Sequence, residues 1–256
     1  MGSSILDAWI KKSYPLKNIY VEELNPSEWL KKKSDEGLNL NCYQLKDIHY
    51  CFLAVKPQSL ETISPILKSL SNKSVTFVSM LAGIEIKRIG EHVGTKEAIA
   101  RIMPNLPAQV FKGVTALVEN EFEKKEKLFE LTTLLESFGA VIKLSSEDKI
   151  DVVTAISGSG PAYIFLMAEL MITEGIKQGL TAEEANVLAK NTILGAGELM
   201  IQSDLTPGQL RENVTSPGGT TQAALLHLME EKNGLPFVLS KAIHAAIQRS
   251  KQLRKV

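Results

Sequence analysis

Apolar and polar positions follow different patterns on the two sides of residue 145. Before it, short continuous apolar runs alternate with amphipathic segments of helical spacing. Continuous apolar strands separated by helices are typical of a parallel sheet that is covered on both faces. The predicted strands are Ile19–Val21, Tyr50–Val55, Val75–Met80, Ala98–Met103, Val114–Val118 and Ala140–Leu144. This pattern predicts an α/β domain over residues 1–145.

Helices are predicted between these strands. The sequence Asn25-Pro26-Ser27-Glu28 opens one, a second runs through Leu70, and a third spans Glu121–Ser137. The charge run Glu121–Lys127 is typical of a solvated helix face.

Helical periodicity replaces the strand pattern after residue 145. The predicted helices are Asp148–Ile156, Ala162–Gln178, Thr181–Ile201, Gly208–Val214, Gln222–Glu231 and Leu235–Leu253. Thr181 and Glu184 have the spacing of a capping box. The helix that follows them is strongly apolar at Leu188, Ile193, Leu199 and Met200. One small domain cannot easily bury that surface, so we predict an all-helical domain over residues 146–256 that forms an intertwined homodimer.

Composition excludes several classes of protein. The chain has 256 residues, with 29 basic and 29 acidic side chains, so its formal net charge is zero and nothing favours a nucleic-acid or membrane surface. We expect no apolar run of membrane-spanning length and see no signal-peptide pattern. The two cysteines do not form a disulfide framework, and Cys51 lies in an apolar run typical of a buried structural thiol. These features indicate a reducing, cytoplasm-like compartment.

Three loops at the predicted carboxyl ends of strands contain glycine, proline or short polar residues. They are Lys56-Pro57-Gln58, Ser79-Met80-Leu81-Ala82-Gly83 and Arg101-Ile102-Met103-Pro104-Asn105. In an open α/β sheet the ligand crevice lies outside these carboxyl ends. Each loop alone is weak evidence, but together they favour a nucleotide crevice.

The run Thr215-Ser216-Pro217-Gly218-Gly219-Thr220-Thr221-Gln222 has the pattern of an anion-binding helix start. Ser216 can cap the helix and Pro217 suits its first position. Two adjacent glycines leave the backbone N–H groups accessible, although each costs roughly 1 kcal/mol inside a helix. Threonine hydroxyls and the helix dipole add further attraction for an anion. An ordinary capped helix start is the alternative interpretation.

Metal and nucleophile sites are not supported. The four histidines are scattered, and none has ligand spacing with a carboxylate or thiol. The sequence Ser157-Gly158-Ser159-Gly160 lacks the first glycine of a nucleophile elbow, because Ala155 occupies that place. We assign these glycines to close helix packing instead.

Four motifs together resemble the Δ1-pyrroline-5-carboxylate reductase family over nearly the whole chain. They are Ala54-Val55-Lys56-Pro57, Arg101 to Ala108, Ile156-Ser157-Gly158-Ser159-Gly160-Pro161-Ala162-Tyr163, and Ser216-Pro217-Gly218-Gly219-Thr220-Thr221. The resemblance implies a Rossmann domain, a helical dimerisation domain, and an active site that reduces a cyclic imine carboxylate to proline with a nicotinamide cofactor.

The resemblance also implies roles for particular residues. Those implied for cofactor binding are Asn25, Asn41, Val55, Lys56, Pro57 and Ala82, with Asn213 nearby. Those implied for substrate binding are Gly219, Thr220 and Thr221, with Glu147 as a further candidate. No proton donor to the imine can be identified: a threonine hydroxyl, a bound water and prior protonation in solvent all remain open.

The preferred cofactor is expected to be NADP, with NAD possible. An acidic residue at the end of the second Rossmann strand favours NAD, and Glu22 and Glu23 are candidates. The resemblance places Asn25-Pro26 at the phosphate-contacting position, which tolerates NADP.

The chain departs from the family at its start. The family opens with a strand and a Gly-x-Gly-Asn-Met-Gly loop, and Met1-Gly2 matches only the end of that loop. We hypothesise that a longer functional protein contains the missing strand, and we expect the chain as written to bind cofactor weakly. One alternative is a non-catalytic dimeric scaffold that has lost cofactor binding. Another is a two-domain hydroxy-acid dehydrogenase with a lysine as acid/base, but Lys177 and Lys190 lack the glycine-rich context expected for it.

Overall fold

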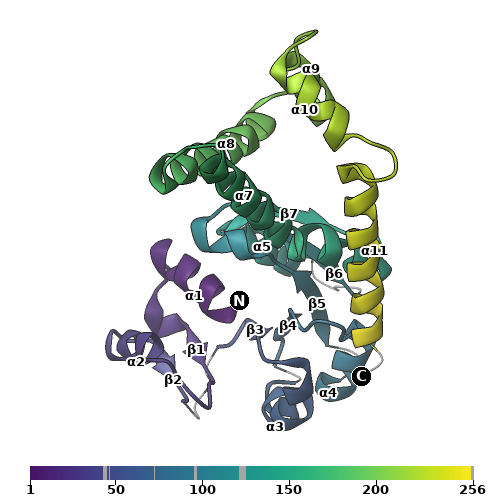
Figure 1. Cartoon of the computed structure of the whole chain (residues 1–256). Coiled ribbons are helices and arrows are strands. Elements are labelled where there is room, and N and C mark those ends of the chain that lie inside the picture. Colours follow the sequence, from purple (N-terminus) through teal and green to yellow (C-terminus); the bar gives the residue numbers. More distant parts are fainter. Residues whose placement is uncertain (43–44, 46, 72, 95–96, 121–124, 255–256) are drawn as a thin grey trace. The chain divides into compact units, whose positions relative to one another are not determined.

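The structure is a computed structural model that describes residues 1–42, 45, 47–71, 73–94, 97–120 and 125–254. The chain divides into two compact units (Figure 1). The first contains Met1–Gly158 together with Gln248–Val256, and the second contains Ser159–Ile247. The domain boundary at residue 145 stays a prediction.

A five-stranded sheet with the order β3-β4-β5-β6-β7 forms the centre of the first unit. Its strands are β3 (Tyr50–Leu53), β4 (Thr76–Ser79), β5 (Ala98–Met103), β6 (Gly113–Glu119) and β7 (Gly139–Lys143). Each of them overlaps a predicted strand. The sheet is mixed rather than parallel throughout, because β6 runs antiparallel to β5. Residues 104–112 join these two strands and hold only a short 3-10 turn, and parallel pairing needs a connection of a dozen or more residues.

The first predicted strand lies in a different sheet. Strand β1 (Tyr20–Val21) pairs in parallel with β2 (Asn39–Leu40), and these two strands form a sheet of their own. The expectation that Ile19–Val21 joins the main sheet is therefore wrong for the residues that the structure describes. Strand β2 was not predicted, since two residues are too few to show an alternating pattern.

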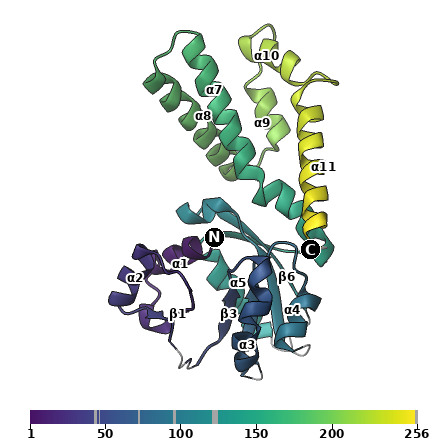
Figure 2. The same ribbon diagram turned by 60° about the horizontal axis from the view of Figure 1, so that its bottom comes forward.

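Helices cover both faces of the main sheet (Figure 2). The helices packed on one face are α1 (Gly2–Lys11) and α5 (Lys125–Glu136), and those on the other are α3 (Leu60–Leu70) and α4 (Ile86–Val93). Helix α2 (Glu28–Asp35) packs beside β1 and β2 instead, and α6 (Ile150–Val153) follows β7. Neighbouring residues of β4 point to opposite faces of the sheet. Val78 packs with Ile5 and Leu131 on one face. Phe77 packs with Leu67 and Ile89 on the other. This two-sided burial explains the continuous apolar runs. The first four residues of the predicted helix Glu121–Ser137 lie outside the described residues. These four residues also make up most of the charge run Glu121–Lys127.

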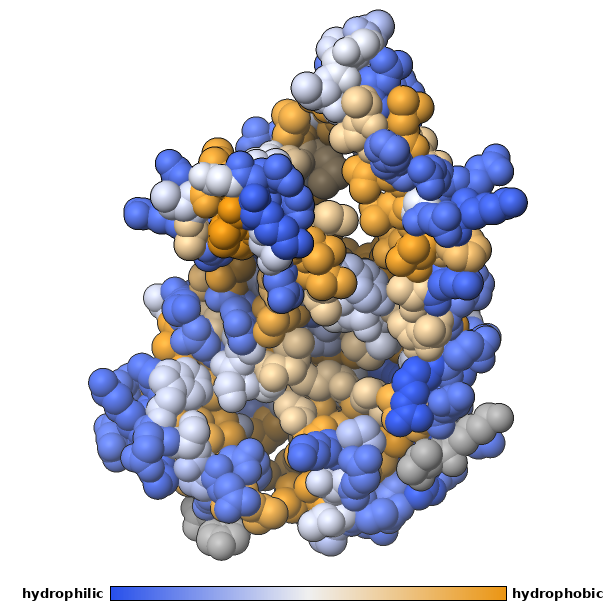
Figure 3. Space-filling view, viewed as in Figure 1, coloured by the Kyte–Doolittle hydropathy of each residue, from blue (hydrophilic) through white to orange (hydrophobic). Residues whose placement is uncertain are grey.

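The second unit is helical, as predicted. It contains α7 (Gly160–Lys177), α8 (Ala182–Gln202), α9 (Pro207–Asn213), α10 (Thr220–Leu228) and most of α11 (Leu235–Leu253). The predicted capping box at Thr181 and Glu184 is confirmed. Many apolar side chains of these helices are exposed, and Figure 3 shows such orange patches on the helical part of the surface.

One stretch contradicts the expectation about membrane-spanning length. Among the described residues, the helical run Glu147–Lys177 is long and apolar enough to cross a membrane by length and composition alone. The run includes a π-helical turn, Thr154–Gly158, before α7 begins. From Gly160 on, the run is α7 of the second unit, where Ile164, Phe165 and Leu166 are exposed.

Candidate active site

Three loops of the first unit lie at one edge of the main sheet. The register pairs Leu53 of β3 with Ser79 of β4, and Ser79 with Arg101 of β5. These parallel strands therefore end side by side. The predicted cofactor residues Val55–Pro57 follow β3 and Ala82 follows β4, so the fold brings them to the same edge.

The loop residues differ in how far they reach into solvent. Lys56 and Ala82 are exposed, whereas Val55 and Pro57 are half-buried. Pro57 also lines a hollow of about 810 Å³, shared with the loop after β4 and with the last turn of α11. A crevice of this size at the carboxyl edge of parallel strands is the usual place for a nucleotide in such sheets.

The polar residues predicted in the β1–β2 region form one hydrogen-bonded group. The amide of Asn41 accepts from Glu23 N at 2.9 Å and donates to Glu23 O at 3.0 Å. The carboxylate of Glu23 in turn accepts from Asn25 N at 3.0 Å. Asn41 has a positive φ of 52°, a conformation that asparagine tolerates better than most residues. The fold thus gathers Asn25 and Asn41 around Glu23 at the carboxyl ends of β1 and β2.

The predicted substrate residues lie at the start of α10, but the helix begins later than expected. Gly219 is the N-cap and Thr220 is the first helical residue. Ser216 is therefore not the cap, and Pro217 is not at the first position. Ser216 O instead accepts from Gly219 N at 3.0 Å, closing a turn ahead of the helix. The physical reason is Gly218, whose φ of 72° lies outside the helical region.

This late start leaves backbone donors at the position where an anion would bind. The first helical hydrogen bond runs from Ala223 N to Gly219 O, so the N–H groups of Thr220, Thr221 and Gln222 precede it. Gly218 N donates to the side chain of Gln222 at 2.6 Å, which holds the turn against the helix. Thr220 is exposed and Thr221 is half-buried.

Asn213 is exposed at the last residue of α9. The expected close packing of Gly158 and Gly160 is wrong. Among the residues that the structure describes, a methyl group on Gly160 would meet nothing within 4 Å, and one on Gly158 would meet only ordinary contacts. These glycines stand where the π-helical turn ends and α7 begins, at a junction of helix types rather than a contact.

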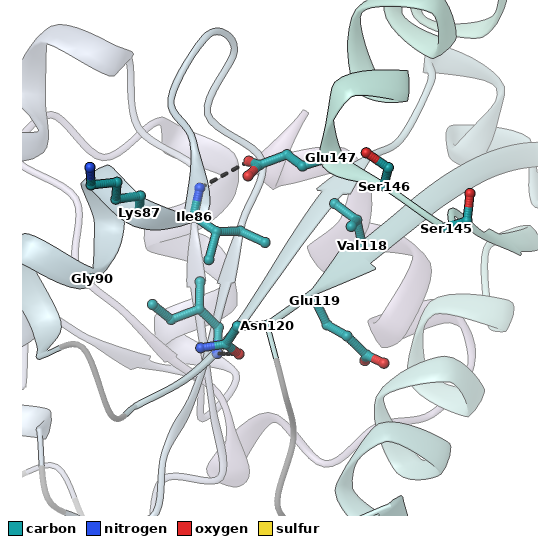
Figure 4. Close-up of a pocket in the computed structure, with 10 residues that line it drawn as sticks. Ile86, Lys87, Gly90, Val118, Glu119, Asn120, Ser145, Ser146 and Glu147 are labelled. Atoms are coloured by element: carbon teal, nitrogen blue, oxygen red, sulfur yellow. Dashed lines mark hydrogen bonds between the residues drawn. The ribbon is translucent and has the colours of Figure 1, made fainter.

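Glu147 is engaged by two groups of the first unit. Its Oε1 accepts from Arg101 Nη1 at 2.7 Å. It also accepts from Ile86 N at 2.9 Å, as Figure 4 shows. The side chain of Arg101 is only 1% exposed, and that of Glu147 is 25% exposed. Burying the guanidinium requires a charged partner, and Glu147 supplies it. Glu147 also lines a second hollow, of about 510 Å³.

The remaining titratable groups do not form a metal centre within the described part of the chain. No three His, Cys, Asp or Glu side chains there come together as metal ligands. Burial raises the pKa of the Cys51 thiol to about 12, so this thiol stays protonated near neutral pH. Cys51 packs at the edge of the apolar cluster around Phe77, in agreement with the predicted structural role.

Known proteins resemble this chain both over its helical unit and over its full length. Residues 147–253 match the pyrroline-5-carboxylate reductase dimerisation family. Over 261 aligned residues, the chain is 36% identical to the pyrroline-5-carboxylate reductase of Staphylococcus aureus (strain MSSA476), covering 100% of this chain and 92% of that protein. The chain belongs to the pyrroline-5-carboxylate reductase family.

Solved structures of this family have the same fold. A pyrroline-5-carboxylate reductase from Coxiella burnetii is similar with a TM-score of 0.89 and 32% identity, covering 100% of this chain and 95% of that one. The Plasmodium falciparum pyrroline carboxylate reductase, solved with NADP bound, gives a TM-score of 0.82 at 28% identity, with 99% and 94% coverage. The Rossmann-type domain followed by a helical dimerisation domain is thus a shared feature of these reductases.

The ion pair between Arg101 and Glu147 was not predicted from the sequence of this pyrroline-5-carboxylate reductase. Arg101 is the lone charged residue inside the apolar strand Ala98–Met103. A buried charge in such a strand requires a partner, and this signal could have indicated a pair. Choosing Glu147 from among the acidic residues requires the tertiary structure, because Glu147 is 46 residues away along the chain.

Proposed function

We propose that this protein reduces Δ1-pyrroline-5-carboxylate to L-proline with NAD(P)H, the last step of proline biosynthesis. Membership of the reductase family supports the reaction. The observation that carries the substrate assignment is the start of α10, where three N–H groups precede the first helical hydrogen bond beside the hydroxyls of Thr220 and Thr221. Such a helix start attracts a carboxylate through its donors and its dipole.

The residues of the first unit fit a dinucleotide. The parallel strands β3 and β4 end at paired residues beside a hollow of about 810 Å³, and the exposed Ala82 allows close backbone approach. Val55, Lys56 and Pro57 would hold the cofactor, together with Ala82 and the Asn25 and Asn41 group. When bound, NAD(P)H supplies a hydride to the carbon of the C=N bond, and the nitrogen gains a proton.

The chain's own contribution is positioning and charge stabilisation. Gly219, Thr220 and Thr221 hold the carboxylate and thereby fix the orientation of the ring. Asn213 remains a proposed cofactor contact. Glu147 remains a candidate near the substrate, although its carboxylate already neutralises Arg101.

We favour NADPH as the cofactor, with NADH as the alternative. The Plasmodium falciparum relative was solved with NADP bound. Asn25 and Asn41 offer neutral polar groups at the β1–β2 loops, although Glu23 adds an acidic group to the same cluster. Comparing kcat/KM for the two cofactors tests this choice.

We also propose that the protein is a homodimer and that it works in the cytoplasm. Residues 147–253 match a dimerisation family, and the helices of the second unit expose many apolar side chains. A second copy of the chain would cover them. Both cysteines are free, which suits a reducing compartment.

Steady-state assays of Thr220→Val and Thr221→Val test the substrate assignment. Each variant removes a hydroxyl donor, and a charge-assisted hydrogen bond contributes about 1.5–3 kcal/mol. We expect the KM for pyrroline-5-carboxylate to rise roughly 10-fold or more, with the KM for the cofactor unchanged.

Thr215→Val is the matched control. Its hydroxyl donates to Arg211 O at 2.6 Å, so it already has a partner within the chain. Equal substrate KM values for all four proteins would contradict the assignment of the carboxylate site. An absence of cofactor oxidation in the wild type would favour the non-catalytic scaffold.

A further inference from the structure

The segment after Ala82 is held unusually closely by the last turn of α11. Gly83 has a φ of 75°, and a methyl group built on it would lie 2.7 Å from the Leu253 carbonyl oxygen. Contacts below 3.0 Å force something to move, and here the neighbouring atoms are backbone. The path of the loop therefore depends on where the end of α11 lies.

An ion-pair cluster fixes that end of α11. The buried Asp151 of α6 accepts from Ser250 Oγ at 2.7 Å and from Arg254 Nε at 3.3 Å, and Arg254 Nη2 lies 2.5 Å from its Oδ2. Arg254 Nη1 donates to Glu85 Oε1 at 2.9 Å, two residues beyond Gly83. We call Glu85, Asp151, Ser250 and Arg254 the Arg254 cluster.

The cluster is built to hold one geometry. The side chain of Asp151 is 1% exposed and that of Arg254 is 18% exposed. A guanidinium that engages two carboxylates through three nitrogens has little freedom to rotate. The charges are also costly to separate once they are buried.

A second ion pair anchors the same segment from its other side. Ile86 N donates to Glu147 at 2.9 Å, and Glu147 is paired with the buried Arg101. The residues 83–86 are thus fixed at Gly83 by backbone contact, at Glu85 by Arg254, and at Ile86 by Glu147. Ala82, the proposed cofactor contact, immediately precedes them.

We propose that Arg254 and Asp151 are positioning residues that hold the Ala82–Gly83 segment in its cofactor-binding conformation. Arg254 lines the crevice, whereas the buried Asp151 does not and acts through Arg254. The proposal rests on the proposed function of the crevice. The carboxyl-terminal end of the chain then contributes to cofactor affinity through the loop after β4. The cluster lies in the first unit and α10 in the second, so we expect the effect on cofactor affinity rather than on substrate affinity.

The test compares Arg254→Met, Arg254→Lys and Glu85→Gln with the wild type in the full chain. Arg249→Met is the matched control, because Arg249 is exposed near the end of α11, five residues before Arg254, and its Nη1 donates to Gln252 Oε1 at 3.2 Å. The Kd of NADPH is measured by fluorescence titration, and the KM for each substrate and kcat by steady-state assay. Thermal melting shows that each variant is folded at the assay temperature.

We expect Arg254→Met to raise the Kd and KM of NADPH roughly 5- to 20-fold. The KM for pyrroline-5-carboxylate at saturating NADPH should stay within about twofold of the wild-type value. Arg254→Lys and Glu85→Gln should give intermediate values, and Arg249→Met should match the wild type.

An unchanged NADPH Kd in Arg254→Met would overturn the proposal, as would a lowered melting temperature with unchanged KM values. A failure of the proposed function would give a different result from a failure of the positioning role. In that case the wild type would bind NADPH without reducing pyrroline-5-carboxylate, and the ratio of Kd values would still test the positioning role.

Discussion

At the scale of single residues, Gly139 is the position where a side chain is least tolerable. Its φ is 147°, and a methyl group built on it would lie 2.0 Å from the Gly113 carbonyl oxygen. The register of β6 and β7 places these two glycines opposite each other. Gly139→Ala must therefore distort the first pair of the two strands. We expect it to lower the free energy of unfolding by roughly 2–4 kcal/mol in urea titrations.

The control for this substitution is Gly208→Ala in α9. A methyl group there would lie 3.9 Å from Thr206 Oγ1, an ordinary contact, and the residue is helical. We expect it to leave stability unchanged or raise it by about 0.5–1 kcal/mol. Unfolding midpoints that are equal for Gly139→Ala and the wild type would show that the strand pair can absorb the methyl group.

Site residues can be predicted from the sequence where they form one local motif, such as the start of a helix. The glycines and threonines at 218–221 predict a helix start, and α10 begins there at Thr220; that this start binds an anion stays a prediction. The predicted N-cap, Ser216, was wrong because serine and glycine are both common N-cap residues. Only the positive φ of Gly218 shows that the helix starts after Gly219 rather than after Ser216. Partners far apart in sequence, such as Arg254 and Asp151, could not be predicted, because they depend on tertiary packing.

At the scale of elements, the start of α8 carries a pH-dependent contribution. Thr181 N and Oγ1 both donate to Glu184 Oε2 at 2.8 Å, and these hydrogen bonds lower the pKa of Glu184. Because the folded pKa lies below the unfolded one, the contribution is fully present above about pH 4.3. It is lost as the pH falls through the lower, folded pKa.

We therefore expect Glu184→Gln to unfold at a lower urea concentration than the wild type at pH 7. The difference should shrink as the pH is lowered below the unfolded pKa. Glu183→Gln is the control, since Glu183 shares the first turn of α8 and the same helix dipole. If both variants lose the same stability at pH 7, the hydrogen bonds to Glu184 contribute nothing beyond its charge.

Most elements of both units follow from apolar periodicity, because burial on two faces or on one stripe leaves a clear pattern. Strand direction does not, since an apolar run reads the same in a parallel and an antiparallel strand. The antiparallel β6 could still have been predicted from the nine residues, 104–112, that separate it from β5. The short β2 could not, because its two residues pair only in the context of β1.

At the scale of the whole molecule, the helices of the second unit leave apolar surface that one chain does not cover. On α8, Leu194 is 67% exposed and Ile201 is 83% exposed, and their spacing of seven residues puts them on one face. Exposed apolar patches of this kind mark association surfaces. The match of residues 147–253 to a dimerisation family identifies a second copy of the chain as the proposed occupant.

Leu194→Glu tests this surface directly. A carboxylate in an apolar interface loses its hydration without gaining a partner, so association should weaken by several kcal/mol. We expect the wild type to elute with a mass of at least twice its 28.1 kDa chain in light-scattering chromatography, and the variant to shift toward the single-chain mass. Lys190→Gln, at an exposed polar position of the same helix, should keep the wild-type mass. A wild-type protein of single-chain mass at micromolar concentration, or an associated Leu194→Glu, would remove α8 from the proposed interface.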